Sequence, residues 1–320
     1  MGDVQVVGLG MAVLDVLVRL KEMPTWQRAA RLSDFSLQGG GPVATAMVAV
    51  SRLGVRAGYV GIAGSDKVAE LKVQSLVENG VDVSRLVRRP GPESQVVLVW
   101  VHEDTGERTF SGVHRSTNPE ALRISELDRD YITVAECLHL DGCHPDAALQ
   151  AAKWMHEAGK KVVLDAGMTS REIRPHLRAL VEHTDVLICG SGFGPGLTGR
   201  KDVWEVGDAI LDMGPGIVVQ TEGADGSYTV THGDRFHTPA FKVDVVDTTG
   251  AGDVFHGAFI VGLLKGWDLR TIALFATAVA AIKCTKLGGR AGIPRYEEAL
   301  AFLRERSIPK RAERTSNECL

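Results

Sequence analysis

The sequence predicts a three-layer α/β/α domain with a mostly parallel central sheet and a small additional β-sheet. Short apolar runs of strand length alternate with amphipathic or Ala-rich runs of helical length along most of the chain. Two stretches, 15–38 and 95–111, interrupt this alternation with strand-like patterns of their own. A parallel sheet covered by helices on both faces accounts for the alternation, and an inserted β-sheet accounts for the two interruptions.

The first third of the chain contains two strand–helix units. A buried strand is predicted at Val4–Val7, before a Gly-Leu-Gly turn. The Ala- and Val-rich segment Pro42–Leu53 predicts a helix that Gly54 ends. A strand is expected at Ala57–Ile62, followed by an amphipathic helix at Val68–Glu78.

The two interruptions indicate an inserted β-sheet. The segment 15–38 has no helical period and predicts short strands around Pro24. The segment 95–111 predicts a hairpin, with strands Val96–Val101 and Glu107–Phe110 joined by an Asp-Thr-Gly turn. A flat β-sheet with apolar faces needs a partner, either a substrate or another subunit.

The rest of the chain repeats the strand–helix unit. The predicted strands are Cys137–Leu140, Lys161–Leu164, Val186–Cys189, Ile217–Thr221 and Phe241–Val246. The predicted helices are Asp146–Ala158, Arg171–His183, Val203–Met213, Asp253–Leu264, Leu269–Thr285 and Tyr296–Glu305. We therefore expect one domain over residues 1–306, and a flexible tail over the polar and basic residues 307–320.

Composition excludes several classes of protein. The 320 residues carry 36 Lys and Arg against 40 Asp and Glu, a weak acidic excess that argues against a general nucleic-acid binder. Apolar runs are shorter than the roughly 20 residues of a membrane span, and the N-terminus lacks the basic start of a secretory signal. The five cysteines have no metal-ligand spacing, which fits reduced thiols. We expect a cytoplasmic protein with no nucleic-acid or membrane partner.

The most informative segment is Asp247-Thr248-Thr249-Gly250-Ala251-Gly252-Asp253-Val254-Phe255, between a predicted strand and a predicted helix. A Gly-Ala-Gly turn that enters a helix lets successive backbone N–H groups point at one anion, and the helix dipole adds to their effect. Asp253 places a carboxylate beside this anion hole. It could accept a proton from an alcohol that attacks a bound phosphoryl group. A tight turn with an acidic cap is the structural alternative.

This segment resembles the second signature of the ribokinase-like (PfkB) carbohydrate kinases. Gly39-Gly40-Gly41 with the following helix resembles the first signature, and Thr221–Gly226 is similar to the family's nucleotide-contact turn. Gly288–Pro294 is similar to its adenine and cation loop. The resemblance covers residues 4–305 in the family order. Within the family, segments 239–257 and 284–294 look most like the bacterial sulfofructose kinases.

The resemblance implies a role for each matched residue. Asp253 would be the catalytic base, and the transferred phosphoryl group would be stabilised by the N–H groups of Gly250, Ala251 and Gly252. The implied sugar contacts are Asp15, Gly40, Gly41, Thr45 and Asp141. The implied ATP contacts are Thr221, Gly223 and Gly226. A monovalent cation such as K⁺ would be held by Asp247 and Thr249.

The chain departs from the family pattern at several positions. Thr45 stands where many members have a sugar-binding Asn, and Gly190 and Phe193 replace the polar residues of an Asn-x-x-Glu motif that helps to organise Mg²⁺. Cys143 lies in the segment where sulfofructose kinases carry a sulfonate-binding Arg, and Gly112 falls near their polar anion contact.

Two weaker signals concern other functions. A Gly-x-Gly turn follows the first strand, but Val13 replaces the third glycine of a dinucleotide fingerprint and strand-like residues follow, so a dehydrogenase is not expected. Arg108, His114 and Arg115 cluster at the end of the predicted hairpin. We expect them to form a solvated rim, with contact to an anionic substrate group as the alternative.

These observations predict an ATP-dependent sugar kinase that transfers the γ-phosphoryl group of Mg·ATP to a hydroxymethyl oxygen of a small sugar or sugar derivative. The resemblance also implies that the two β-stretches form a lid, often shared in a homodimer. A sugar- or nucleotide-sensing protein without turnover is one alternative. A kinase specific for sulfofructose, or for a sugar acid such as 2-keto-3-deoxygluconate, is another.

Overall fold

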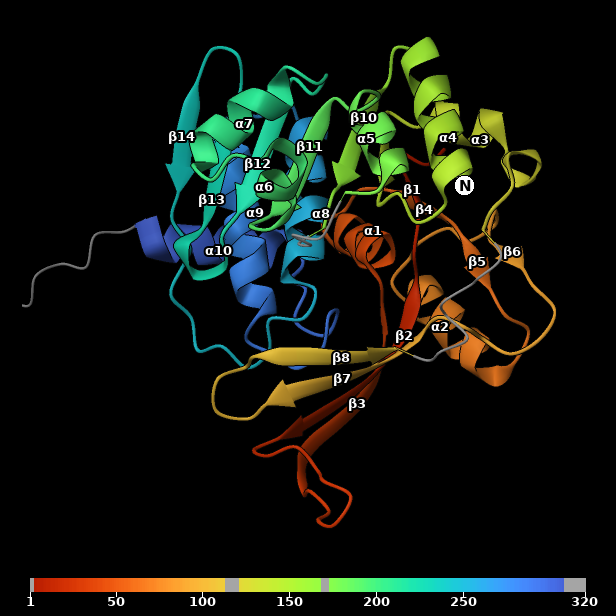
Figure 1. Ribbon diagram of the computed structural model, residues 1–320, viewed down its shortest axis with the longest axis vertical. Coiled ribbons are helices and arrows are strands. Elements are labelled where there is room, and N and C mark those ends of the chain that lie inside the picture. The colour runs from red at the N-terminus through yellow and green to blue at the C-terminus, as the bar shows by residue number, and fades with distance from the viewer. Residues whose placement is uncertain (1–2, 113–120, 168–172, 308–320) are drawn as a thin grey trace, which may run out of the picture.

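An eight-stranded sheet runs through the middle of the molecule in the computed structural model, which describes residues 3–112, 121–167 and 173–307 (Figure 1). Its strand order is β14-β13-β12-β11-β10-β9-β1-β4. All neighbours from β12 to β4 pair in parallel, and β13 and β14 add an antiparallel edge. The strands are β1 (Val6–Leu9), β4 (Ala57–Val60), β9 (Cys137–Leu140), β10 (Lys161–Asp165), β11 (Val186–Gly190), β12 (Ile217–Thr221), β13 (Ser227–Val230) and β14 (Arg235–Thr238).

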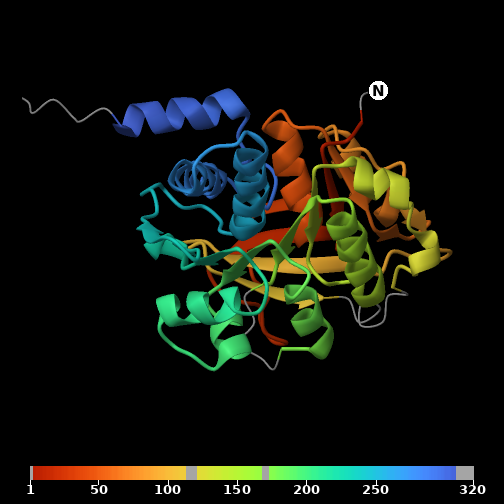
Figure 2. The same cartoon turned by 90° about the horizontal axis from the view of Figure 1, so that it is seen from above.

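Helices cover both faces of this sheet, as the view in Figure 2 shows. One layer contains α1 (Pro42–Arg52), α8 (Ala251–Leu264), α9 (Leu269–Lys283) and α10 (Tyr296–Ser307). The other contains α3 (Arg129–Val134), α4 (Pro145–Glu157), α5 (Pro175–Val181), α6 (Phe193–Thr198) and α7 (Val203–Leu211). Along β10, Val163 packs into the first layer, whereas Val162 and Leu164 pack into the second. This alternation is the reason that each strand is a continuous apolar run.

The two interrupting stretches pair into one four-stranded sheet, here called the small sheet, which lies across one end of the domain (Figure 1). Its order is β3-β2-β7-β8, with β2 and β7 parallel and the outer pairs antiparallel. The strands are β2 (Val13–Leu20), β3 (Leu32–Gly40), β7 (Val96–His102) and β8 (Arg108–Gly112). The strands expected on either side of Pro24 are present, and with eight and nine residues they are longer than the short strands that were expected.

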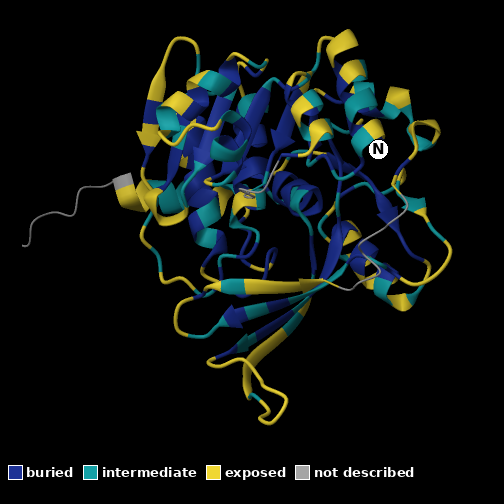
Figure 3. Ribbon diagram, viewed as in Figure 1, coloured by how far each residue is buried: buried dark blue, intermediate teal, exposed yellow. Residues whose placement is uncertain are grey.

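The remaining described elements are smaller. A two-stranded parallel pair, β5 (Ile62–Ala63) and β6 (Val87–Arg88), flanks α2 (Lys67–Val77). Short 3₁₀ turns occur at Ile124–Glu126 and Gly223–Asp225. Figure 3 shows the central sheet buried and β3 largely exposed.

One predicted strand is absent, and one predicted helix begins later than expected. Residues 241–246 form no strand, and the helix predicted from Arg171 begins at Pro175. Phe241 packs edge-to-face on Phe302 of α10, whereas Val246 packs on the apolar cluster beneath the small sheet. The apolar alternation of Phe241, Val243 and Val245 is thus not matched by strand pairing, and Val245 is 44% exposed. The antiparallel β13–β14 pair has no counterpart in the sequence prediction.

Other expectations can be compared with the described residues. No helix among them is long and apolar enough to cross a membrane. The four described cysteines, Cys137, Cys143, Cys189 and Cys284, are free thiols. The predicted tail lies outside the described residues from position 308 onward.

Candidate active site

The candidate site is built at the carboxyl ends of the parallel strands. Asp141 follows β9, Asp165 ends β10, and Thr221 ends β12. Because these strands are parallel, all three residues lie at one edge of the sheet, where α/β folds bind their ligands. Helix α8 begins over the same edge, since His256 in its second turn contacts the main-chain oxygen of Ile188 on β11 at 3.3 Å.

The predicted anion hole forms the start of α8. Gly250 has a φ of 73°, in the left-handed region that glycine adopts without strain, and is the N-cap residue of the helix. A side chain at position 250 would lie 2.9 Å from Cα of Gly289, so the close approach also requires glycine. Gly252 faces open space. The N–H of Ala251 donates a long hydrogen bond of 3.2 Å to the main-chain oxygen of Thr248. The turn therefore presents backbone donors at the positive end of a 14-residue helix.

Asp253 lies in the first turn of α8 and is partly exposed. Burial and, to a smaller extent, the nearby negative charge of Asp165 raise its pKa to about 6, while His256, Arg108 and Lys283 act in the opposite direction. A carboxyl group with this pKa is mostly ionised at pH 7 and can accept a proton.

Asp15 projects from β2 on the face of the small sheet that is turned toward the domain. It is only 5% exposed, and burial raises its pKa to about 7. Arg290 opposes this pKa shift, whereas Asp253 adds to it. Because the charge of Asp253 acts on Asp15, the predicted sugar-binding and catalytic carboxylates belong to one site. Gly40 lies against Asp15, since a side chain there would stand 2.0 Å from the Asp15 carboxylate.

Thr45 contacts an arginine that sequence reasoning missed. Thr45 is buried on α1, after the N-cap residue Gly41, and its hydroxyl oxygen accepts a hydrogen bond from Nε of Arg290 at 3.3 Å. Arg290 also donates to Ser75 and to the main-chain oxygen of Gly40, both at 2.9 Å. It thus connects the loop after α9 to the predicted sugar-binding strand end. The only sequence signal for it is a lone arginine in a Gly-rich apolar segment.

Asp141 makes structural contacts at the same sheet edge. Its two carboxylate oxygens accept main-chain N–H groups of Met11 at 2.8 Å and Cys143 at 2.9 Å. Burial raises its pKa to about 7. These contacts fasten the loop between β1 and β2, which leads directly to Asp15.

The predicted nucleotide contacts lie in the turn between β12 and β13. Thr221 donates its hydroxyl to the main-chain oxygen of Cys189 at 3.2 Å, and Gly223 opens the 3₁₀ turn that Gly226 ends. In the place of the family's Asn-x-x-Glu motif, the structure has the end of β11 and a fully buried Phe193.

Arg108 does not belong to a solvated rim. It is half-buried on β8, and its guanidinium donates to the hydroxyl of Thr248 at 2.5 Å. The small sheet therefore contacts the anion loop directly. His114 and Arg115 lie outside the described residues.

His256, a buried histidine that no sequence motif indicated, holds the first turn of α8, which carries Asp253. Nδ1 of His256 lies 2.7 Å from the main-chain oxygen of Gly252, and Nε2 lies 3.7 Å from the Asp165 carboxylate. His139 on β9 lies beside it, with ring centroids 5.4 Å apart. Burial lowers the pKa of His139 to about 3, so its ring is neutral. His256 thereby fastens the first turn of α8 to the sheet.

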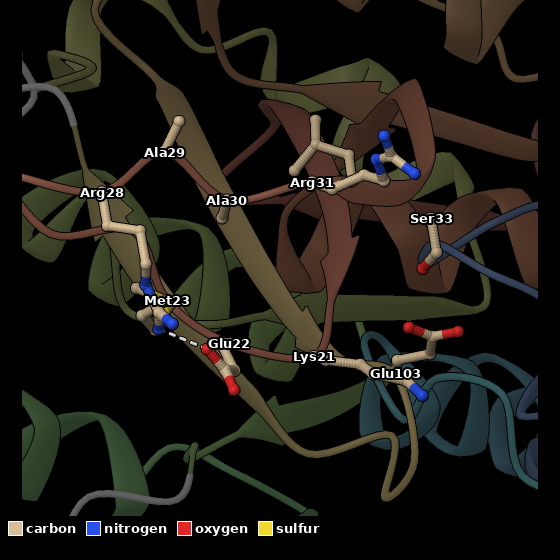
Figure 4. Close-up of a pocket in the computed structure, with 10 residues that line it drawn as sticks. Lys21, Glu22, Met23, Arg28, Ala29, Ala30, Arg31, Ser33 and Glu103 are labelled. Carbon is tan, nitrogen blue, oxygen red and sulfur yellow. Dashed lines mark hydrogen bonds and ion pairs between the residues drawn. The ribbon is translucent and has the colours of Figure 1, made fainter.

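Two further observations limit where ligands can be placed. A cavity of about 470 Å³ at the outer end of the small sheet contains none of the predicted site residues (Figure 4). Its lining combines charged side chains with apolar ones such as Met23 and Leu32, and Arg28 and Glu22 are paired at its side. Within the described residues, no group of three or more His, Cys, Asp or Glu is arranged to hold a metal ion.

Comparison with known proteins gives a consistent result. The family description "pfkB family carbohydrate kinase" matches residues 3–295. The ATP-dependent ribose-1-phosphate kinase of Halopiger xanaduensis is 31% identical, covering 95% of this chain and 99% of its own. The 2-dehydro-3-deoxygluconokinase of Bacillus subtilis is 28% identical, covering 85% and 88%. The crystal structure of a ribokinase from Thermotoga maritima superposes with a TM-score of 0.80 at 26% identity, covering 94% and 99%.

The family match spans nearly the whole chain and includes every motif assembled at this sheet edge. The glycines of the anion loop, Asp253 and the turn after β12 lie toward one edge of the sheet on a ribokinase-like fold. This chain therefore belongs to the pfkB family of carbohydrate kinases.

Proposed function

We propose that this sugar kinase transfers the γ-phosphoryl group of Mg·ATP to a hydroxymethyl oxygen of a small sugar, with Asp253 as general base. The observation that supports this most directly is the position of Asp253, in the helix turn that presents the anion hole and within electrostatic reach of Asp15. Catalysis would then consist of positioning and electrostatic stabilisation, as in other phosphoryl transfers.

The donor would be bound at the turn between β12 and β13, with Thr221, Gly223 and Gly226 against the nucleotide. Mg²⁺ usually keeps several waters and is held by substrate phosphates with one or two carboxylates. Asp165 would be the second carboxylate near the phosphoryl group, since its carboxylate lies 3.7 Å from Nε2 of His256 on α8 and its charge acts on Asp253. The donor set of the site thus fits an ion that arrives with ATP.

The test of the base is Asp253→Asn. General-base removal is expected to lower kcat by about 10²- to 10⁴-fold while the KM for ATP changes little. The control is Asp244→Asn, which changes an exposed aspartate in the preceding loop. If Asp253→Asn retains nearly full turnover, Asp253 is not the base.

The pH dependence gives a second test. A base with a pKa of about 6 must be ionised to act, so wild-type kcat is expected to fall by about tenfold from its plateau at pH 5. A flat profile down to pH 5 would contradict the assignment.

The substrate is best found with an ADP-release assay over neutral, acidic, sulfonated and phosphorylated sugars and nucleosides. The panel includes ribose 1-phosphate and 2-dehydro-3-deoxygluconate because the relatives above act on them. Sulfofructose belongs in it because of the resemblance at 239–257. A sensing protein would show ligand-dependent melting shifts without ADP release from any sugar.

We further propose that the small sheet is a lid that pairs two copies of the chain. Phe35 and Leu37 on β3 are 55% and 50% exposed. They share the outer face with Val18 and Val16, their cross-strand partners, and with Trp100 on β7. An exposed apolar strip on an edge strand is typical of an interface. Phe35→Glu is expected to shift sedimentation from dimer to monomer, and a wild-type monomer at micromolar concentration would contradict the proposal.

A further inference from the structure

The structure tests whether the monovalent-cation site implied at Asp247 and Thr249 fits such an ion. Asp247 is completely buried. One carboxylate oxygen accepts both the N–H and the hydroxyl of Thr249 at 2.7 Å, and the other accepts the N–H of Gly288 at 2.7 Å. Its main-chain oxygen accepts Nζ of Lys283 at 2.8 Å. Each oxygen of Asp247 therefore already has a hydrogen-bond donor from the chain itself.

Lys283 is an unusual residue for this position. It is the last residue of α9, and it is 0% exposed, although lysines are almost never fully buried without a partner. Its amine reaches under the loop that leads to the anion hole. Burial lowers its pKa, whereas the negative charges of Asp247 and Asp253 act in the opposite direction. The amine of Lys283 thus interacts both with Asp247, the implied cation ligand, and with Asp253, the proposed catalytic base.

Proteins bind potassium by surrounding it with oxygen atoms that replace its water shell, with main-chain carbonyls prominent among them. Here a main-chain oxygen of that kind is already bonded to a primary amine. A potassium ion placed on the same oxygen would lie close to the ammonium group, and two like charges at such short range repel each other, the more strongly where burial removes the screening water. The site therefore accommodates one of the two cations. Lys283, being covalently attached, loses no translational freedom when it occupies the site.

We infer that the ammonium group of Lys283 takes the place of the monovalent cation, so that this kinase works without potassium. The inference rests on the proposed phosphoryl-transfer function, because the charge is placed beneath the loop that would hold the transferred group. The residues at Asp247 consequently do not fit a potassium ion as long as Lys283 is present.

The experiment compares potassium chloride with tetramethylammonium chloride at equal ionic strength. The protein is purified free of K⁺, Na⁺ and NH₄⁺, and both the kinase rate and the ligand-free melting temperature are recorded. For the wild type, we expect rates that agree within about twofold and melting temperatures that do not depend on the salt. Several-fold activation by potassium, or a melting temperature that rises with potassium alone, would overturn the inference.

The variant Lys283→Met removes the charge and keeps the length of the side chain. We expect kcat in tetramethylammonium chloride to fall by at least about tenfold, with potassium restoring part of the rate and raising the melting temperature. Lys286→Met, an exposed lysine three residues further along, should behave as the wild type in both salts. If a folded Lys283→Met variant shows neither a higher rate nor a higher melting temperature in potassium, the ammonium group and potassium do not occupy the same position.

These results are separable from the proposed function. If Lys283→Met does not fold, the wild-type comparison between the two salts still decides the inference. If no sugar in the panel supports turnover, the proposed function fails, but the salt dependence of melting still tests whether Lys283 occupies a cation site.

Discussion

Replacing Asp15 by Asn is expected to stabilise the ligand-free protein at neutral pH and to abolish sugar binding. Burial raises the pKa of Asp15 from 3.8 to about 7, so between these values the native state holds a proton that the unfolded chain has released. The folded-state pKa of this acid lies above its unfolded value. Its contribution to stability therefore becomes less favourable as pH rises from about 4 to about 7.

The magnitude follows from the two pKa values. Linkage gives a destabilisation of about 2 kcal/mol at pH 5 and about 4 kcal/mol at pH 7. Asparagine has no such proton equilibrium. The free energy of unfolding of Asp15→Asn should therefore exceed that of the wild type by about 2 kcal/mol more at pH 7 than at pH 5. In a protein of this size, that difference corresponds to roughly 4 °C in Tm.

The assay is thermal melting of Asp15→Asn and wild type from pH 5 to pH 8 without ligands, followed by sugar titration at pH 7. Asp34→Asn, which changes an exposed aspartate on the neighbouring strand, serves as the control. The reasoning is refuted if the difference in Tm between Asp15→Asn and wild type does not change with pH. Asp15 would then behave as an ordinary carboxylate.

Three further changes test the contacts around the site. Arg108→Gln removes the charged contact with Thr248 and should lower kcat/KM by about 10- to 100-fold, with melting unchanged; a destabilised variant with full kcat/KM would contradict this. Lys72→Met leaves Glu93, its buried partner at 2.7 Å, without a counter-charge, so the free energy of unfolding should fall by about 3–5 kcal/mol in urea titration. Adding Glu93→Gln, which removes the unpaired charge and keeps an oxygen that can accept a main-chain N–H of Gly64 or Gln95, should restore part of it, and no recovery would show that the unpaired charge is not the cause. Gly250→Ala forces a left-handed conformation and a contact with the next loop, so we expect a loss of about 1–2 kcal/mol in unfolding free energy and a larger loss in kcat.

The sequence predicted the parallel half of the fold well because local patterns encode it. Each parallel strand is a short apolar run between helices, and Cys137–Leu140 and Ile217–Thr221 have their predicted limits. The segment 241–246 was mispredicted because its apolar alternation does not match its burial: Val245 is 44% exposed, whereas Val246, outside the alternation, packs beneath the small sheet. The β13–β14 edge was missed because its residues mix polar and apolar types without a strong period.

The candidate site could be predicted where a motif encodes it, and not where a distant segment supplies the partner. The glycines and Asp253 lie within one short run, so the sequence displays them together. Arg290 and Lys283 act on residues about 250 and 36 positions away. The residues next to Arg290 and Lys283 in the sequence form no pattern that indicates which distant residues these side chains contact. Arg108 was misjudged for the same reason, since its partner Thr248 belongs to a different part of the chain.

The parallel pairing of β2 with β7 has a consequence for how the molecule folds. Leu14 pairs with Val96, whereas the outer pairs β2–β3 and β7–β8 are local. Two hairpins can therefore form early, but their joining must close the loop between the end of β3 and the start of β7, about 55 residues, which is entropically slow. The small sheet should thus be assembled late, after α1 and α2 have folded between its halves. A refolding chain would acquire its central sheet first and its capacity to bind sugar last, so recovery of sugar binding should lag behind recovery of helical content.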